Sequence, residues 1–319
     1  MLTKISSSLA PKKVINAIVT LYHQGKIADI LARTPKILEQ YPDTPSLHNI
    51  LGVIHFHQGL KQEAANYFRK TIDLLPNDPD AYNNLGNVCK EEKKYKEAIL
   101  NYEKAIKIKP NYLKAYENLF LIFQTKKDTT NSEKLIKKAL KILNTIPKNN
   151  ILIWKKWVIM CLHEIAENYE SKKDCAKAKK TYKQAIQIKN DYIPSLNNLG
   201  NLLFKEGLID EALKYFKIAK KFNFKNTTIL NNIALIFFKK KNYFLSTKYL
   251  EKAINQKQDS HYLFCNLMFC YMNIFKNKEA NKFLEILKND WINHNNYSNY
   301  NFTYLDQVLF SIVYSNYLN

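Results

Sequence analysis

The sequence predicts an all-α solenoid built from about eight helical hairpins. A fixed spacing is the first observation, because the tripeptide HQG at His23–Gly25 recurs at His57–Gly59. The same spacing separates the stretch NNLG at 197–200 from NNIA at 231–234. The second observation is that no segment shows the apolar–polar alternation of a β-strand. A period of about 34 residues is typical of proteins in which each unit buries its apolar face against its neighbours.

Residues 79–112 define the frame of the repeat, since their apolar and small residues recur at the three- and four-residue spacing of a helix face. The frame counts Pro79 as position 1, and its defining residues are Tyr82 at position 4, Leu85 at 7, Gly86 at 8, Ala98 at 20, Tyr102 at 24, Ala105 at 27 and Pro110 at 32. This pattern resembles the tetratricopeptide repeat, a helix–turn–helix unit of the same length. The resemblance implies a right-handed superhelix of such units.

Extending the frame along the chain predicts four repeats over residues 11–146 and four more over residues 159–294. Residues 1–10 are then an N-terminal tail, and residues 147–158 are an insertion that extends a helix of the fifth repeat. Residues 295–319 are expected to form a C-terminal capping helix. Because this helix is apolar on nearly every side, it is predicted to dock onto a second copy, a partner or another domain.

Glycine placement argues against an enzyme. All six glycines fall at position 8, where two helices approach each other, or at position 15, in the turn between them: Gly25, Gly52, Gly59, Gly86, Gly200 and Gly207. None is left for a phosphate-binding loop or a nucleophile elbow. Where position 8 is bulky, at Ile18, Phe120 and Met268, the repeat is expected to pack less regularly. Pro35 is expected to kink or shorten the second helix of the first repeat.

The formal net charge of +21 raises the possibility of nucleic-acid binding. Only Arg33 and Arg69 are arginine, however, and arginine is the residue that reads bases by paired hydrogen bonds. Most of the charge is therefore interpreted as solvated lysine on exposed helix faces, and nucleic-acid binding is kept as an alternative.

Composition also predicts no metal, no cofactor and no membrane span. The five cysteines have no CxxC spacing, and His48, His55 and His57 lack a carboxylate or thiol that would complete a metal site. No apolar run reaches the roughly 18 residues that a membrane-spanning helix needs. The N-terminus has no small-residue cleavage site of a secretory signal, so the cytoplasm is the expected compartment.

Asparagine recurs at position 6 of the first helix although it is a poor helix former, disfavoured against alanine by about half a kcal/mol. Positions 6 and 9 lie opposite the packed face of that helix, which in tetratricopeptide arrays looks into the concave groove. A primary amide can donate to a carbonyl and accept from an N–H of an extended chain. The predicted peptide-binding residues are Asn84, Asn118, Asn198, Asn232 and Asn266 at position 6, with Asn87 and Asn201 at position 9. The alternative is that these asparagines only support the packing of the repeats.

Two further features are candidates for partner contact. Phe204, Phe238 and Met272 recur at position 12 and could form an apolar edge of the groove. Trp154 and Trp157 belong to or adjoin the insertion, where they either extend the helix or form a knob on which a partner docks.

These observations predict a non-catalytic protein–protein interaction scaffold that binds an extended polypeptide in its groove. The array resembles the asparagine-lined superhelix of the O-GlcNAc transferases. The stretch HNILG at His48–Gly52 also resembles the arrays that precede sulfotransferase or glycosyltransferase domains. The resemblance implies an alternative function, in which the chain is the substrate-recruiting region of a glycosyltransferase- or sulfotransferase-type system whose catalytic domain is absent from this chain.

Overall fold

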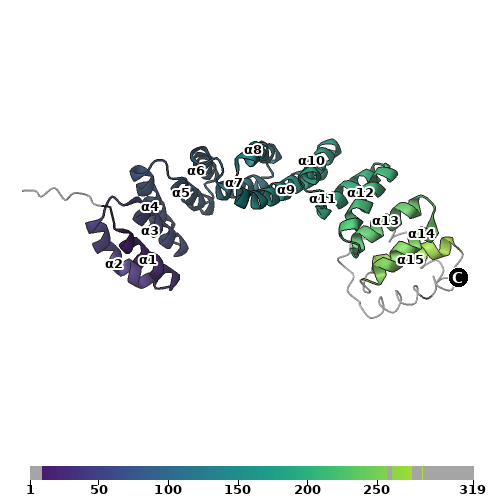
Figure 1. Ribbon diagram of the computed structural model, residues 1–319, viewed down its shortest axis with the longest axis horizontal. Helices are drawn as coiled ribbons and strands as arrows, with labels where there is room; N and C mark the ends of the chain where they lie inside the picture. The colour runs from purple at the N-terminus through teal and green to yellow at the C-terminus, as the bar shows by residue number, and fades with distance from the viewer. Residues whose placement is uncertain (1–8, 257–260, 275–281, 283–319) are drawn as a thin grey trace, which may run out of the picture. The chain divides into compact units, whose positions relative to one another are not determined.

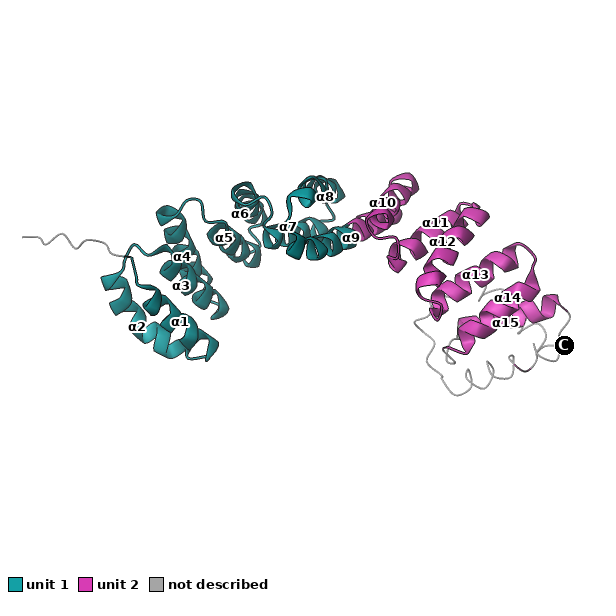
Figure 2. Cartoon of the chain, in the orientation of Figure 1, with its two compact units in different colours: residues 1–161 teal, residues 162–319 magenta. Residues whose placement is uncertain are grey.

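The computed structural model describes residues 9–256, 261–274 and 282 (Figure 1). The chain divides into two compact units, residues 1–161 and 162–319, each of which is considered by itself (Figure 2). The helices of unit 1 are α1 (Lys12–His23), α2 (Ile27–Gln40), α3 (Pro45–His57), α4 (Lys61–Leu74), α5 (Pro79–Glu91), α6 (Tyr95–Ile108), α7 (Leu113–Thr125), α8 (Thr129–Ile142) and the short 3-10 helix η1 (Leu143–Thr145). The helices of unit 2 are α10 (Cys175–Ile188), α11 (Ile193–Lys205), α12 (Ile209–Phe222), α13 (Thr227–Lys239), α14 (Tyr243–Ile254) and α15 (His261–Asn273). The boundary between the units falls within α9 (Lys148–Ser171).

The predicted all-α repeat fold is confirmed over the described residues, where no strand is present. Helices α3, α5 and α7 begin at residues 45, 79 and 113, and α11, α13 and α15 begin at 193, 227 and 261, so the interval is constant and equals the period predicted from the sequence. Within each hairpin the two helices pack together, as α5 does on α6 and α11 on α12. The first helices α3, α5 and α7 also contact one another in order, and α11 contacts α13. One face of each unit is therefore built from successive first helices.

Position 8 is small where position 24 of the same hairpin is aromatic. A Cβ added to Gly52 would lie 2.5 Å from the Phe68 ring, and one added to Gly86 would lie 2.6 Å from the Tyr102 ring. In the first and fourth hairpins Ile18 and Phe120 occupy this position, and both are buried. As expected, α1 with α2 and α7 with α8 pack less extensively than the hairpins that have glycine there. The second helix of the eighth repeat lies outside the described residues, so the expectation for Met268 stays a prediction.

Pro35 does not shorten its helix, and that part of the expectation is wrong. Helix α2 contains Pro35 and runs for 14 residues, the same length as α4. The helical φ of proline is compatible with the helix, and the lost backbone hydrogen bond is offset because α2 buries Ile30 and packs Ile37 and Leu38 on the core of unit 1.

The turn between the two helices of a hairpin has a left-handed residue at position 15. Three of these residues are glycine, and four are lysine: Gly25, Gly59, Gly207, Lys93, Lys127, Lys173 and Lys241. Lys93, for example, has φ 59°. The turn is therefore required by the fold even where glycine is missing, and a residue with a Cβ is disfavoured there by about 1–2 kcal/mol.

Replacing Lys93 with glycine is accordingly expected to raise the free energy of unfolding. The gain should be about 0.5–1 kcal/mol, because relief of the left-handed conformation exceeds the entropy that glycine adds to the unfolded chain. Chemical denaturation of the full chain measures it. The reverse substitution, Gly207→Lys, is the matched control and should lower stability by a similar amount; a loss of stability in Lys93→Gly contradicts the explanation.

Trp154 and Trp157 belong to the core of unit 1. They are 2% and 5% exposed, and Trp157 lies edge-on to Tyr116, Phe120 and Trp154, with ring centroids 5.9, 6.1 and 5.9 Å away. The alternative of a partner-docking knob is therefore wrong, because neither indole is accessible. Both tryptophans lie in α9, whose 24 residues include 148–158 and make it much longer than the other first helices.

Candidate functional site

Asparagines of successive first helices are joined by side-chain hydrogen bonds. Each bond runs from the amide nitrogen at position 6 of one repeat to the amide oxygen at position 5 of the repeat before it. In unit 1, Asn84 donates to Asn49 at 3.0 Å and Asn118 donates to Asn83 at 3.1 Å. In unit 2, Asn232 donates to Asn197 at 2.9 Å and Asn266 donates to Asn231 at 3.0 Å. The recurrence of a helix-disfavoured residue thus has a structural reason, since each bond ties neighbouring repeats together.

The same four side chains keep an unused acceptor. Asn84, Asn118, Asn232 and Asn266 are partly exposed, and within the described part of the chain their Oδ1 atoms accept no hydrogen bond. Asn232 also donates to Asn201 at 2.9 Å, so both of its N–H groups are used. Asn84 and Asn118 lie in unit 1 and Asn232 and Asn266 in unit 2, and we call the face that carries two of them the asparagine face of its unit. Asn84, Asn118 and Asn266 each donate one bond and keep a second N–H, so these three amides can still both donate and accept, whereas Asn232 can only accept.

The amide oxygens of the asparagines at position 9 already accept a hydrogen bond each, Asn87 within its own repeat and Asn201 from the next. Asn87 Oδ1 accepts from the Tyr102 hydroxyl at 2.8 Å, and Asn201 Oδ1 accepts from Asn232. Asn87 therefore retains its N–H groups. Asn198, at position 6, differs from the four asparagines above because it donates to Glu167 Oε1 at 3.2 Å and to the Tyr182 hydroxyl at 3.3 Å.

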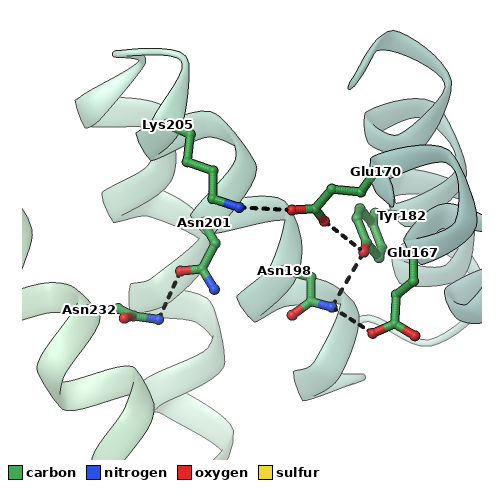
Figure 3. Close-up of polar contacts among 7 residues, drawn as sticks. All are labelled: Glu167, Glu170, Tyr182, Asn198, Asn201, Lys205 and Asn232. Carbon is green, nitrogen blue, oxygen red and sulfur yellow. Dashed lines mark hydrogen bonds and ion pairs between the residues drawn. The ribbon is translucent and has the colours of Figure 1, made fainter. Parts of the chain in front are cut away.

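A pocket of about 590 Å³ opens next to Asn198 in unit 2. Its lining comes from the end of α9 and from α11: Glu167, Glu170, Ser171, Asn198, Asn201, Phe204 and Lys205. Figure 3 shows Asn198 directed at Glu167 and Tyr182, with Lys205 reaching Glu170. Here the fifth repeat has Glu167 at position 9 and Glu170 at position 12, where none of the other seven repeats has a glutamate. This pocket was not predicted from the sequence, although the two glutamates occupy fixed positions of the repeat.

The two glutamates of the pocket have different partners. Glu170 accepts from the Tyr182 hydroxyl at 3.2 Å through Oε2 and pairs with Lys205 Nζ at 3.1 Å through Oε1. Glu167 is contacted through Oε1 by Asn198 and by His163 Nε2 at 3.4 Å. Burial lowers the pKa of His163, an effect that Glu167 opposes. Burial and the nearby Glu167 raise the pKa of Glu164. The side of α9 that faces α11 is thus locally acidic.

The predicted apolar edge is only partly brought together. Phe204 lines the pocket. Phe238 instead packs on Tyr243 and Phe269, with ring centroids 5.3 and 5.2 Å away, and so belongs to the core of unit 2. Met272 is 39% exposed and does not line this pocket. The three side chains therefore do not form one continuous strip.

No cluster of histidine, cysteine and carboxylate side chains that could hold a metal is found in residues 9–256, 261–274 and 282. His48 and His55 bond to the backbone oxygens of Pro42 and Leu51 at 2.7 and 2.8 Å. Among the described helices, none is long and apolar enough to span a membrane. The predicted C-terminal docking helix, residues 295–319, lies outside the described residues.

Comparison with known proteins gives family matches in both units. Tetratricopeptide repeat families match residues 36–79, 79–112, 161–192 and 193–226. No curated protein sequence matches the chain.

Solved structures resemble the chain in fold. The C-terminal part of a TPR repeat-containing protein from Cytophaga hutchinsonii has a TM-score of 0.57 at 11% identity, covering 79% of this chain and 99% of the other. The Naa15/Naa10 complex bound to HypK-THB has a TM-score of 0.52 at 14% identity, covering 81% of this chain and 38% of the other. YrrB, described as a TPR protein with an unusual peptide-binding site, has a TM-score of 0.43 at 20% identity, covering 62% of this chain and 96% of the other. At these identities the similarity to the first two structures shows the fold alone.

Proposed function

The chain is a tetratricopeptide repeat protein, with repeats in both units. On that basis we propose that it binds an extended polypeptide along the asparagine face of a unit, without catalysing a reaction. Tetratricopeptide repeats are protein–protein interaction modules and are generally non-catalytic, which supports this broad class of function. The more specific proposal concerns the surface and the form of the ligand.

The observation that carries the proposal is the unused acceptor on Asn84, Asn118, Asn232 and Asn266. An extended polypeptide presents backbone N–H groups at regular intervals, and each could donate to one such oxygen. The bonds to the preceding repeat hold the amides in one orientation before the ligand arrives. Less side-chain freedom is then lost on binding, which favours affinity.

The charge of this face favours a polypeptide over a nucleic acid. The asparagines are neutral, and the pocket beside those of unit 2 carries Glu167 and Glu170. Nucleic-acid binding depends on neutralising phosphates with positive charge, which neither the asparagines nor the two glutamates supply.

The test separates ligand binding from packing by comparing the two ends of the same hydrogen bonds. Asn118→Ala with Asn266→Ala removes two exposed acceptors and two inter-repeat bonds. The matched control, Asn83→Ala with Asn231→Ala, removes the same two bonds, but its residues are 3% and 8% exposed and cannot reach a ligand.

Random peptides displayed on phage are selected on the native full chain, and the selected peptides are synthesised and titrated against all three proteins. The first variant is expected to weaken binding by roughly ten- to a hundredfold, since each lost hydrogen bond contributes about 0.5–1.5 kcal/mol. The control should bind like the native chain. Equal weakening in both variants, unchanged binding in both, or failure of the native chain to select any peptide contradicts the proposal.

A further inference from the structure

The pocket between α9 and α11 has the size and placement of a side-chain subsite. Its volume, about 590 Å³, lies within the range of roughly 300–1,000 Å³ that is usual for small-ligand sites. Asn198 and Asn201 line it, and Asn201 is bonded to Asn232 of the asparagine face. A polypeptide lying on that face would therefore pass the mouth of this pocket.

The charge of the pocket is opposite to that of the chain as a whole. The protein has a formal net charge of +21, yet the ionised side chains that line the pocket are Glu167, Glu170 and Lys205, two negative and one positive. Glu164 lies close enough to Glu167 for its pKa to be affected. A cationic group is attracted to this place, whereas the surrounding lysine-rich surface repels it.

One carboxylate of the pocket is oriented but not fully used. Glu167 has a side chain that is 51% exposed, and both of its contacts, from Asn198 and His163, are made through Oε1. No hydrogen bond to Oε2 occurs within the described ranges. Glu167 is thus held in position while it retains an oxygen that faces solvent, which is the arrangement required to accept a bond from a ligand.

The other carboxylate already binds an ammonium group of the chain. Lys205 Nζ lies 3.1 Å from Glu170 Oε1, and the side chain of Lys205 is 68% exposed. Pairs this exposed are weak and exchange readily. Lys205 therefore occupies the pocket as a cation from a ligand would, and it can move away when one arrives. Phe204 in the same lining offers an apolar surface for the methylene groups of a long side chain.

We propose that this pocket binds the side chain of an arginine or lysine in the polypeptide ligand, between Glu167 and Glu170 and over Phe204, with displacement of Lys205. The inference rests on the proposed function, because the ligand is taken to be the polypeptide on the asparagine face. It adds a charge preference to a surface that otherwise recognises the backbone alone. Arginine is the better fit, since its planar guanidinium can bridge two carboxylate groups.

The probes are short glycine–serine peptides that differ at one central residue: arginine, lysine, or citrulline, which has the shape of arginine but no charge. Their affinities for the full chain are measured by NMR titration. The native chain should bind the arginine and lysine peptides about tenfold or more tightly than the citrulline peptide. In Glu167→Gln with Glu170→Gln this difference should disappear, while citrulline binding stays unchanged. Lys205→Gln should raise the affinity for the arginine peptide several-fold, because the internal competitor is gone.

The matched control is Glu103→Gln with Glu211→Gln, which removes two carboxylates from exposed positions of second helices. This variant should preserve the preference for arginine. Equal binding of the arginine and citrulline peptides to the native chain, or no binding of either, overturns the pocket proposal. Preservation of the preference in the Glu167 and Glu170 variant overturns it as well. The asparagine variants decide the proposed function separately, since they can weaken the phage-selected peptides whether or not the pocket prefers a cation.

Discussion

Replacing Trp157 with alanine is expected to lower the free energy of unfolding of unit 1 by about 3–5 kcal/mol. The indole is 5% exposed and contacts Tyr116 and Phe120 of α7 and Trp154 of its own helix. Its removal leaves a cavity lined by three rigid aromatic rings, which cannot collapse to fill the space. The cost should therefore lie near the upper end of the range for a buried aromatic residue.

Hydrogen exchange of the full chain is the most informative measurement, because repeat proteins do not always unfold in one step. Faster exchange is expected to be concentrated in α7 and in the part of α9 that precedes residue 162. Leu152→Ala is the matched control, since Leu152 belongs to the same helix and is 75% exposed; its effect should stay within about 0.5 kcal/mol. A Trp157 variant as stable as this control would show that the aromatic cluster does not hold α9 on unit 1.

The fold was predictable because the same local sequence pattern recurs in many repeats. The fixed period, prolines at the helix starts and glycine at close helix contacts each recur, so a single irregular unit does not hide the pattern. The backbone conformation at a single position was harder to predict. Lys93 occupies the left-handed turn position that glycine holds elsewhere, and nothing in the local sequence marks it as strained.

The candidate site was predictable in part. The asparagine pattern identified the residues. It could not show that Asn118 donates a hydrogen bond to Asn83, because that bond joins residues 35 apart in sequence. A doublet of asparagines at positions 5 and 6 is the signal that could have indicated it. The acidic pocket was harder still, since it depends on the approach of Glu170 to Lys205, again 35 residues away. Partners separated by one repeat are visible only once the hairpins are stacked.

The pairing of Gly200 with Phe216 makes a second strong prediction. A Cβ added to Gly200 would lie 2.6 Å from the ring of Phe216, which is 1% exposed and cannot swing into solvent. Gly200→Ala should therefore destabilise unit 2 by about 1–3 kcal/mol through overpacking, even though alanine is the better helix former. The native chain contains a compatible pair at the same two positions in the next hairpin, where Ala234 and Leu250 are both buried.

Copying that pair should rescue the substitution. Phe216→Leu alone is expected to cost about 1–2 kcal/mol for the lost volume, but in Gly200→Ala with Phe216→Leu the smaller side chain makes room for the new methyl group. The double variant should accordingly be more stable than the sum of the two single losses predicts, by at least about 1 kcal/mol. Chemical denaturation of the four proteins gives this coupling energy directly. Additive losses would mean that the two residues do not limit each other, and that glycine at position 8 serves some purpose other than making room for an aromatic ring.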